Sequence, residues 1–244
     1  MRVLVGLFVY NEIDYIKSFI KYYKSQDCEF CFIDNYSDDG TYEYLLEQGF
    51  DVKRVDTDDC FDLVKLQKEL LKSIHEIKPD WIIIAAADTF IIFDGTIKEE
   101  IFKASQRGYN QISTIYLKPY NTGEKFRLPL ESNYFYIEER GRKLFISKYD
   151  ENINFKVDDF SIKNSKLFKS NGVLINYGDC KPAEYRKNIY KRRKKAWENG
   201  LDKKFGEHYK SGNEKNWKWD KNKLIDIRKT KYYFFVEKLH DITL

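Results

Sequence analysis

Short apolar runs alternate with longer amphipathic segments along the first half of the chain. Apolar runs of about four to eight residues fit buried strands, and the longer segments repeat apolar residues at helical spacing, as Leu63, Leu66 and Leu70 do. This pattern predicts strands at 3–10, 29–34, 51–55, 81–85 and 111–117, and helices at 12–25, 40–48, 59–77 and 96–106. Such alternation indicates an α/β fold in which a parallel sheet has helices on both faces.

The pattern is looser beyond residue 118. Aromatic and β-branched residues there predict strands at 132–138, 143–148 and 172–177, and helical spacing predicts helices at 182–198 and 220–239. We expect one compact domain in which residues 1–118 and 119–244 form two halves.

Polar residues follow three of the predicted strands. Asn11 and Glu12 follow the first strand, Asp34 and Asn35 end the second, and Asp88 closes the apolar run of the fourth. The carboxyl ends of parallel strands share one edge of a sheet, which is where open α/β sheets bind ligands. That edge would offer acceptors to a base or ribose, and a carboxylate to a cation that bridges phosphates. For Asp88 alone, the alternative is that it caps the following turn.

Taken in order, the segments at 10–12, 33–41 and 80–90 resemble family 2-type glycosyltransferases of GT-A fold. The resemblance covers residues 3 to about 95 and is specific for the three motifs together, not for any one of them. It implies a mostly parallel central sheet flanked by helices, with a mixed acceptor-side half and C-terminal helices. Residues 1–118 would bind a nucleotide-sugar such as a UDP-sugar, and residues 119–244 would form the acceptor side and a basic helical portion.

The resemblance also implies roles for the polar residues at the strand ends. The residues expected beside the donor are Asn11, Glu12, Asp34, Asn35 and Asp88. Ala86 stands where the family's metal motif has its first acid, so Asp88 alone is left to hold Mn²⁺ or Mg²⁺. One carboxylate and the diphosphate suffice when waters complete the shell. Transfer without a metal, with Lys or Arg neutralising the diphosphate, is the other possibility.

A weaker similarity lies at 174–178, before a basic helix, where related sequences often have a His-Tyr pair. Asn176 stands where a histidine would help to hold the metal. Transfer to a hydroxyl also needs a base, and by resemblance inverting enzymes of this fold use a carboxylate. The candidates are Asp158 and Asp159, with Asp159 preferred, and an exposed acidic turn is the alternative reading.

These residues predict a glycosyltransferase that moves a sugar from a nucleotide-diphosphate donor to an acceptor hydroxyl. The acceptor would be a glycan, a lipid-linked sugar or a modified nucleic-acid base. Two alternatives stay open because fold alone does not fix chemistry. One is a nucleotidyltransferase-like enzyme, which would need a second strong acid near Asp88. The other is a non-catalytic nucleotide- or polyanion-binding protein of the same fold, with the missing acid at Ala86 as its sign.

Positive charge is concentrated near the C-terminal end. Residues 181–244 hold 19 Lys and Arg against 9 Asp and Glu, while the whole chain has a formal net charge of +4. The densest run, 185–197, is either a solvated helix face or a surface for an anionic acceptor, nucleic acid or a membrane. A further alternative is that some of its bases face the diphosphate of the sugar donor. No apolar run reaches the length of about 18 residues that a transmembrane helix needs. The first apolar run lacks the flanks of a signal peptide, so we expect a cytoplasmic protein, with peripheral membrane association left open.

Two of the four cysteines, Cys28 and Cys31, have the CxxC spacing of metal and redox sites. No second CxxC pair exists, and the two cysteines lie at the entry to the second predicted strand. We therefore expect buried free thiols rather than a metal or redox pair.

Overall fold

The computed structural model describes residues 1–120, 133–156, 159–161, 164–201 and 223–243. Its strands are β1 (Val3–Val9), β2 (Glu29–Asp34), β3 (Val52–Arg54), β4 (Trp81–Ile84), β5 (Thr89–Ile92), β6 (Gln111–Pro119), β7 (Tyr134–Lys148), β8 (Asn154–Lys156), β9 (Asp159–Ser161), β10 (Leu167–Asn176) and β11 (Ile225–Asp226). Its α-helices are α1 (Ile13–Ser25), α2 (Thr41–Glu47), α3 (Leu63–Ile77), α4 (Ile97–Gln106), α5 (Ala183–Glu198) and α6 (Tyr233–Thr243). These bounds confirm the predicted elements of the first half to within a few residues.

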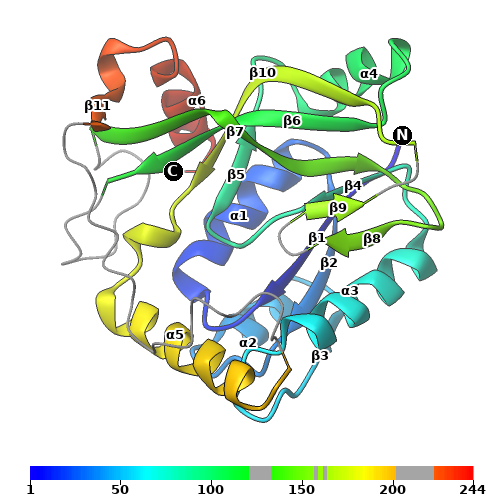
Figure 1. Ribbon diagram of the computed structural model, residues 1–244, viewed down its shortest axis with the longest axis vertical. Helices are drawn as coiled ribbons and strands as arrows, with labels where there is room; N and C mark the ends of the chain where they lie inside the picture. The colour runs from blue at the N-terminus through cyan, green and yellow to red at the C-terminus, as the bar shows by residue number, and fades with distance from the viewer. Residues whose placement is uncertain (121–132, 157–158, 162–163, 202–222, 244) are drawn as a thin grey trace.

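The main sheet has a parallel N-terminal half and a mixed remainder (Figure 1). Its strand order is β3-β2-β1-β4-β7-β6-β10-β5, and β11 pairs with β7 outside this path. β1 runs parallel to β2 and β4, and β2 runs parallel to β3. β7 is antiparallel to both β4 and β6, and β5 is antiparallel to β10. This α/β arrangement is the one expected of a GT-A-like fold.

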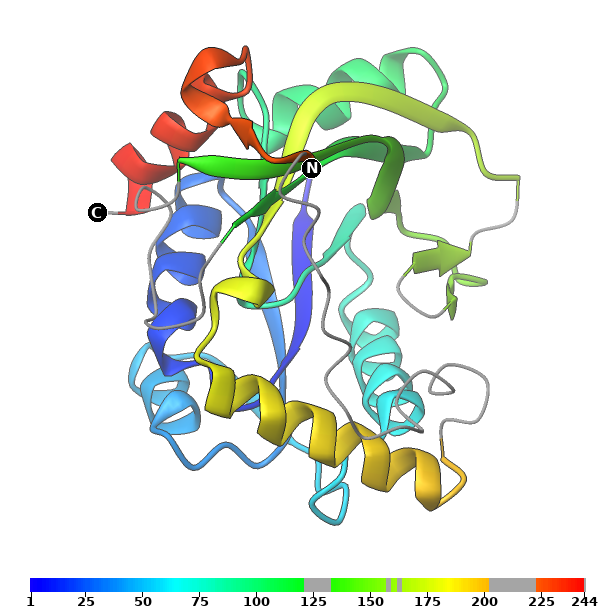
Figure 2. The same ribbon diagram turned by 60° about the vertical axis from the view of Figure 1, so that its left-hand side comes forward.

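Helices bury both faces of the parallel half. Alternate residues of β1 point to opposite faces, so that Val3, Val5 and Leu7 pack into the core under α1, whereas Leu4 packs into the core under α3. Gly6 lets α3 approach closely, because a Cβ atom there would lie 3.2 Å from a methyl group of Leu70. α5 crosses the end of the sheet to which β1 points, between α2 and α3 (Figure 2).

Helix ends follow local capping chemistry. The side chain of Asp62 accepts a hydrogen bond from the Lys65 amide, so α3 begins at Leu63 and not at residue 59. Thr96 and Glu99 form a capping box at the start of α4. α1 begins without a side-chain cap from Glu12, which leaves that carboxylate available for other contacts.

Three predictions of secondary structure were wrong. Residues 132–148 contain one long strand, β7, whose described part bridges β4 and β6, so the break expected at 139–142 does not occur. β5 was not predicted, because the turn after Ala85 splits one apolar run into two strands. The helix predicted at 220–239 fails in its described N-terminal part: Ile225 pairs with Phe135 of β7, and α6 begins only at Tyr233.

Among the described helices, none combines the length and the hydrophobicity that crossing a membrane would require.

Candidate functional site

The turn from β1 to α1 is tied to the loop after β2. Asn11 takes a left-handed backbone conformation (φ 54°), which Asn tolerates better than most residues. Its side chain donates to Asp38 (2.7 Å) and accepts from the Asp38 amide (2.9 Å). The carboxylate of Asp39 accepts from the amide of Ile13 at the start of α1 (3.0 Å). Asn11 therefore fixes the geometry of this loop. The side chain of Glu12 takes no part in these contacts.

Asp34 is fully buried at the end of β2. Its carboxylate accepts from the Ser37 amide and from Nε of Arg54 on β3, which lies 3.0 Å away. The Arg54 guanidinium in turn lies between the rings of Tyr36 and Tyr42, at 4.4 and 4.2 Å from their centroids. Asp34 thus holds the loop after β2 to β3 in this structure.

Asn35 connects β2 to the distant helix α5. Its amide nitrogen donates to the carbonyl of Val55 and to Thr57, at 2.9 and 2.8 Å. Its amide oxygen accepts from Nη2 of Arg192, 2.7 Å away. The Arg192 guanidinium also lies 3.5 Å from the ring centroid of Tyr10, at the end of β1. The side chain of Arg192 is 4% exposed, and its Nε lies 3.7 Å from Oδ1 of the exposed Asp59. Neither Nε nor Nη1 has a hydrogen-bond partner among the described residues.

Asp88 lies in the turn between β4 and β5, where the antiparallel pairing of β5 with β10 sets Asn176 opposite Thr89. Asn176 donates to the Thr89 hydroxyl (2.9 Å), and the Thr89 hydroxyl donates to Oδ1 of Asp88 (3.1 Å). The amide of Tyr177 donates to the carbonyl oxygen of Asp88 (2.8 Å). Asp88 is 5% exposed, so these contacts fix a buried carboxylate at the edge of the sheet.

A buried lysine joins Asp88 to Glu12. Nζ of Lys181 lies 2.5 Å from Oε1 of Glu12 and 2.8 Å from Oδ2 of Asp88. The Tyr185 hydroxyl also donates to Oε1 of Glu12 (2.9 Å). Burial raises the pKa of Glu12 to about 7, against the opposing effect of the Lys181 charge. Burial lowers the pKa of Lys181, but the charges of Asp88 and Glu12 outweigh it and leave that pKa raised.

The structure brings Glu12 and Asp88 to one cluster, and it holds Asp34 and Asn35 in contacts with Arg54 and Arg192. The expectation that polar ends of several strands meet at one edge is therefore met in the fold. The expected contacts with a donor stay predictions. Oε2 of Glu12 is buried and has no hydrogen-bond partner among the described residues, as is true of two nitrogens of Arg192. Buried polar atoms without partners are unusual, and here they suit contact with a ligand.

Of the two candidate bases, Asp158 lies outside the described residues. Asp159 is the first residue of β9, which pairs with β8 through Asp159 and Lys156. The segment that leads to this hairpin is attached near the start of β4, where the Tyr149 amide donates to the carbonyl of Asp80. The side chains of the hairpin are not described, so the role of Asp159 stays a prediction.

Sequence reasoning did not single out Lys181 or Arg192 as residues of the site. Lys181 stands alone before Pro182, with no motif around it, and Arg192 is one base within the run 185–197. The charge pattern of that run allows a solvated face, a polyanion surface or contacts with the diphosphate of the donor, and it does not distinguish Arg192 from its neighbours. The sequence signal that could have indicated these residues is the weak similarity at 174–178, because in related sequences a basic helix follows this segment.

The residues present do not fit a divalent metal while Lys181 is in place. Its ammonium already contacts Asp88 and Glu12, and no group of three or more His, Cys, Asp or Glu side chains within the described parts of the chain is arranged to hold an ion. Mn²⁺ and Mg²⁺ need several oxygen ligands. The contacts of Lys181 therefore leave no set of oxygen ligands for Mn²⁺ or Mg²⁺ beside Asp88 among the described residues.

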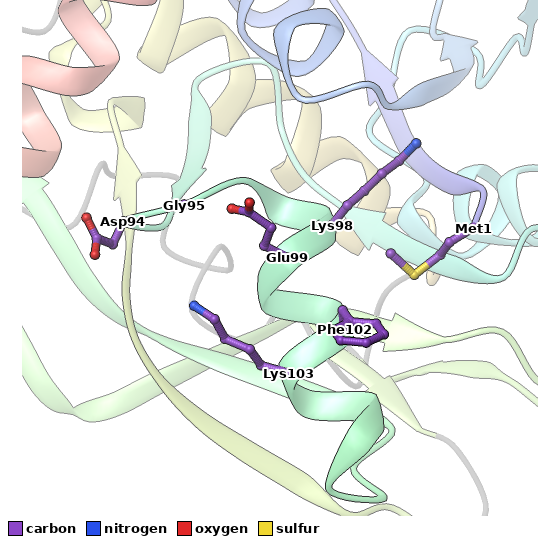
Figure 3. A pocket seen from close by; sticks show the side chains of 7 residues that line it. All are labelled: Met1, Asp94, Gly95, Lys98, Glu99, Phe102 and Lys103. Carbon is purple, nitrogen blue, oxygen red and sulfur yellow. The ribbon is translucent and has the colours of Figure 1, made fainter.

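A separate surface depression of about 650 Å³ lies away from this cluster. It is lined by Met1, Asp94, Gly95, Lys98, Glu99, Phe102 and Lys103. Figure 3 shows that its labelled side chains diverge rather than converge on one point. Met1 precedes β1, so the depression lies toward the amino end of that strand, whereas Glu12 follows its carboxyl end. The two sites are distinct.

No protein-family model matches the chain, and no curated protein matches it. Solved structures similar to it include TarS from S. aureus, with 12% identity over 86% of this chain and 41% of TarS, and a TM-score of 0.46. A TarS 1-349 complex with UDP-GlcNAc matches 54% of this chain and 42% of that chain, with 16% identity and a TM-score of 0.35. HddC from Yersinia pseudotuberculosis matches 78% of this chain and 99% of its own, with 14% identity and a TM-score of 0.38. The chain spans about two fifths of TarS, and similarities this low carry no argument about activity.

Proposed function

We propose that this chain is a nucleotide-sugar-dependent glycosyltransferase. The observation that carries the proposal is the buried cluster of Glu12, Asp88 and Lys181 at the edge where the parallel strands end. Open α/β sheets bind ligands at this edge. A buried charged cluster beside polar atoms without partners is typical of a functional site rather than of a structural ion pair alone.

The proposed chemistry is transfer of a sugar from a nucleoside diphosphate to an acceptor hydroxyl. The leaving diphosphate gains charge, which a fixed cation stabilises, and the hydroxyl loses a proton to a base. In this proposal residues 1–118 bind the donor, and Lys181 and Arg192 reach the same site from the second half. The acceptor side is formed by residues 119–244, with Asp159 or Asp158 as the base.

Arg192 would meet the nucleoside or its phosphates. Arg192 offers Nε and Nη1 beside the ring of Tyr10, and Asn35 holds the guanidinium in this orientation. A planar guanidinium suits a carbonyl group of a base or a phosphate oxygen. The arrangement does not select among uracil, cytosine, guanine and thymine.

A thermal-shift screen tests donor binding. The ligands are UDP, GDP, CDP, TDP and their sugars, and binding to the native state alone raises the melting temperature. Release of nucleoside diphosphate from the donor is then measured for the wild type, for Asp88→Ala and for the control Asp51→Ala. Asp51 is an exposed acid before β3, away from the cluster. We expect release by the wild type and the control, and its loss in a folded Asp88→Ala protein.

Other results would contradict the proposal. Nucleotide binding without hydrolysis or transfer to any acceptor would favour the non-catalytic alternative. Unchanged release by Asp88→Ala would remove Asp88 from the mechanism. No shift with any nucleotide would argue against a donor site at this edge.

A further inference from the structure

Lys181 is the least expected member of the cluster, since a lysine side chain is seldom buried. Its side chain is 8% exposed, and those of Glu12 and Asp88 are 10% and 7% exposed. The rings of Tyr185 and Tyr15 flank the ammonium, with centroids 4.8 and 5.3 Å away. An ammonium group lying between two carboxylates and two aromatic rings occupies the position that a bridging cation would take.

The backbone before Lys181 also fixes the position of its side chain. The Tyr177 amide bonds to the carbonyl of Asp88, and a short 3-10 turn at Gly178–Cys180 then carries the chain to Lys181. Gly178 passes so close to the turn after β4 that a Cβ atom there would lie 3.3 Å from Oδ2 of Asp88. Lys181 is therefore held by strand pairing and not by its side-chain contacts alone.

The oxygen atoms of the two carboxylates are nearly all engaged. Oδ2 of Asp88 contacts Lys181, and Oδ1 accepts from Thr89 and lies 3.5 Å from the amide nitrogen of Asn176. Oε1 of Glu12 accepts from Lys181 and Tyr185. Only Oε2 of Glu12 has no hydrogen-bond partner within the described part of the chain. A divalent ion would have to displace the ammonium to gain its usual number of oxygen ligands.

The ammonium itself has capacity for a ligand. It carries three N–H donors, and the two carboxylates engage two of them in the described structure. The third can donate to a phosphate oxygen, as the compact charge of lysine does in other phosphate sites. Arg192 adds a second cation on the same edge, because its guanidinium lies on the ring of Tyr10. The carbonyl oxygen of Tyr10 is 2.9 Å from the Tyr185 hydroxyl, which also contacts Glu12.

We infer that Lys181 replaces the divalent cation of this site, so that its ammonium, and not a metal ion, meets the diphosphate of the donor. The inference rests on the proposed function for the identity of the ligand. The exclusion of metal follows from the chain's own contacts and can be tested without a nucleotide. The two positions are then consistent: Ala86 supplies no carboxylate for a metal ion, and Lys181 supplies a fixed cation in its place.

The first test is a calorimetric titration of the protein with Mn²⁺ alone. We expect no binding to the wild type and a gain of binding in Lys181→Ala, which frees two adjacent carboxylates for the ion. Lys21→Ala is the matched control, because Lys21 is an exposed lysine on α1. Binding of Mn²⁺ to the wild type that is lost in Asp88→Asn would overturn the inference, whatever the nucleotide results are.

The second test measures the affinity for a nucleoside diphosphate in EDTA and in Mn²⁺. For the wild type the two dissociation constants should agree within about twofold, because the cation is part of the chain. Lys181→Ala should weaken binding in EDTA by about tenfold or more, the size expected for a lost charged hydrogen bond, and Mn²⁺ should restore part of it. A requirement of the wild type for Mn²⁺, or unchanged affinity in the variant, would overturn the inference.

A second variant guards against misfolding. Glu12→Gln with Lys181→Met removes one negative and one positive charge, so the formal charge of the cluster is unchanged. This protein should fold and should still bind the nucleotide weakly in EDTA. Normal binding by the double variant would contradict the inference. If the wild type binds no nucleotide in either buffer, the proposed function fails, and the Mn²⁺ titration still decides whether Lys181 excludes a metal.

Discussion

Arg192 donates a hydrogen bond of 2.7 Å to the side-chain oxygen of Asn35, and this contact joins α5 to the end of β2. The same nitrogen lies 3.1 Å from the carbonyl oxygen of Cys60, in the loop before α3. Because the guanidinium also covers the ring of Tyr10, one side chain closes the site across three segments. This pairing makes the basic helix part of the site and not only a solvated surface.

Replacing Arg192 should therefore affect both folding and binding. Arg192→Met keeps much of the packing volume but leaves the oxygen of Asn35 without its donor. We expect a loss of about 1–3 kcal/mol in the free energy of unfolding, which denaturant titration measures. Nucleotide affinity, measured by calorimetry, should fall by about tenfold or more.

The neighbouring Lys191→Met provides the control for Arg192, since Lys191 is exposed on the same helix. It should change neither stability nor affinity appreciably. Equal behaviour of the two variants would show that the buried contact with Asn35 has no special role.

Glu12 should make stability depend on pH. Burial raises the pKa of its carboxyl to about 7 from an ordinary value of 4.5, so the folded protein holds a proton that the unfolded chain has released in that interval. The free energy of unfolding is therefore highest below pH 4.5 and falls as the pH rises to about 7. The groups that face this carboxyl are Asp88, Lys181 and Tyr185, and they are unchanged in a Glu12→Gln variant.

The measurement compares the free energy of unfolding of the wild type and Glu12→Gln at several pH values. Between about pH 5 and pH 8 the wild type should lose up to about 3 kcal/mol relative to the variant, which cannot titrate at this position. Parallel curves for the two proteins would show that Glu12 keeps an ordinary pKa in the folded state.

The CxxC pair should behave as two unrelated thiols. Cys28 packs beside the core under α1 and Cys31 lies in the core under α3, since residues three apart in an extended chain face opposite sides. All four cysteines are free in the structure, and Cys28 is only partly buried whereas the other three are buried. Burial raises the pKa of Cys28 to about 12 and that of Cys31 to about 11.

Alkylation by iodoacetamide at neutral pH should consequently be slow in the native protein and complete after denaturation, as followed by mass spectrometry, because the thiolate is the reactive form. Oxidation should not join Cys28 to Cys31. Rapid labelling of Cys31 in the native state, or a disulfide between these two residues, would contradict the placement of β2.

The exposed face of α5 remains a candidate surface for a polyanion. Lys187, Lys191 and Lys195 are exposed there, although Lys195 also contacts the carbonyl of Asp58. The double variant Lys187→Glu/Lys191→Glu should weaken binding to heparin and to anionic vesicles, and should reduce the salt dependence of that binding. Lys21→Glu on α1 is the control with one substitution, and a loss about half that of the double variant would indicate an effect of net charge alone.

Much of the fold follows from local patterning. The apolar runs at 3–9, 29–34 and 81–84 form strands, and Leu63, Leu66, Leu70 and Ile74 are all buried on one face of α3. Polar residues at the ends of parallel strands meet at one edge, as Glu12 and Asp88 do. The strands and helices follow from periodicity, which nearby residues determine, and the shared edge follows because consecutive β-α-β units place parallel strands side by side.

The sequence alone did not determine which residues complete the site. β7 lies between β4 and β6, and β10 lies between β6 and β5, through pairings between segments far apart in the chain. That order carries Lys181 to Asp88 and Arg192 to Asn35, although no motif marks either base. A buried charge is stable only beside its partners, and tertiary contacts alone decide which of many surface lysines and arginines acquires such partners.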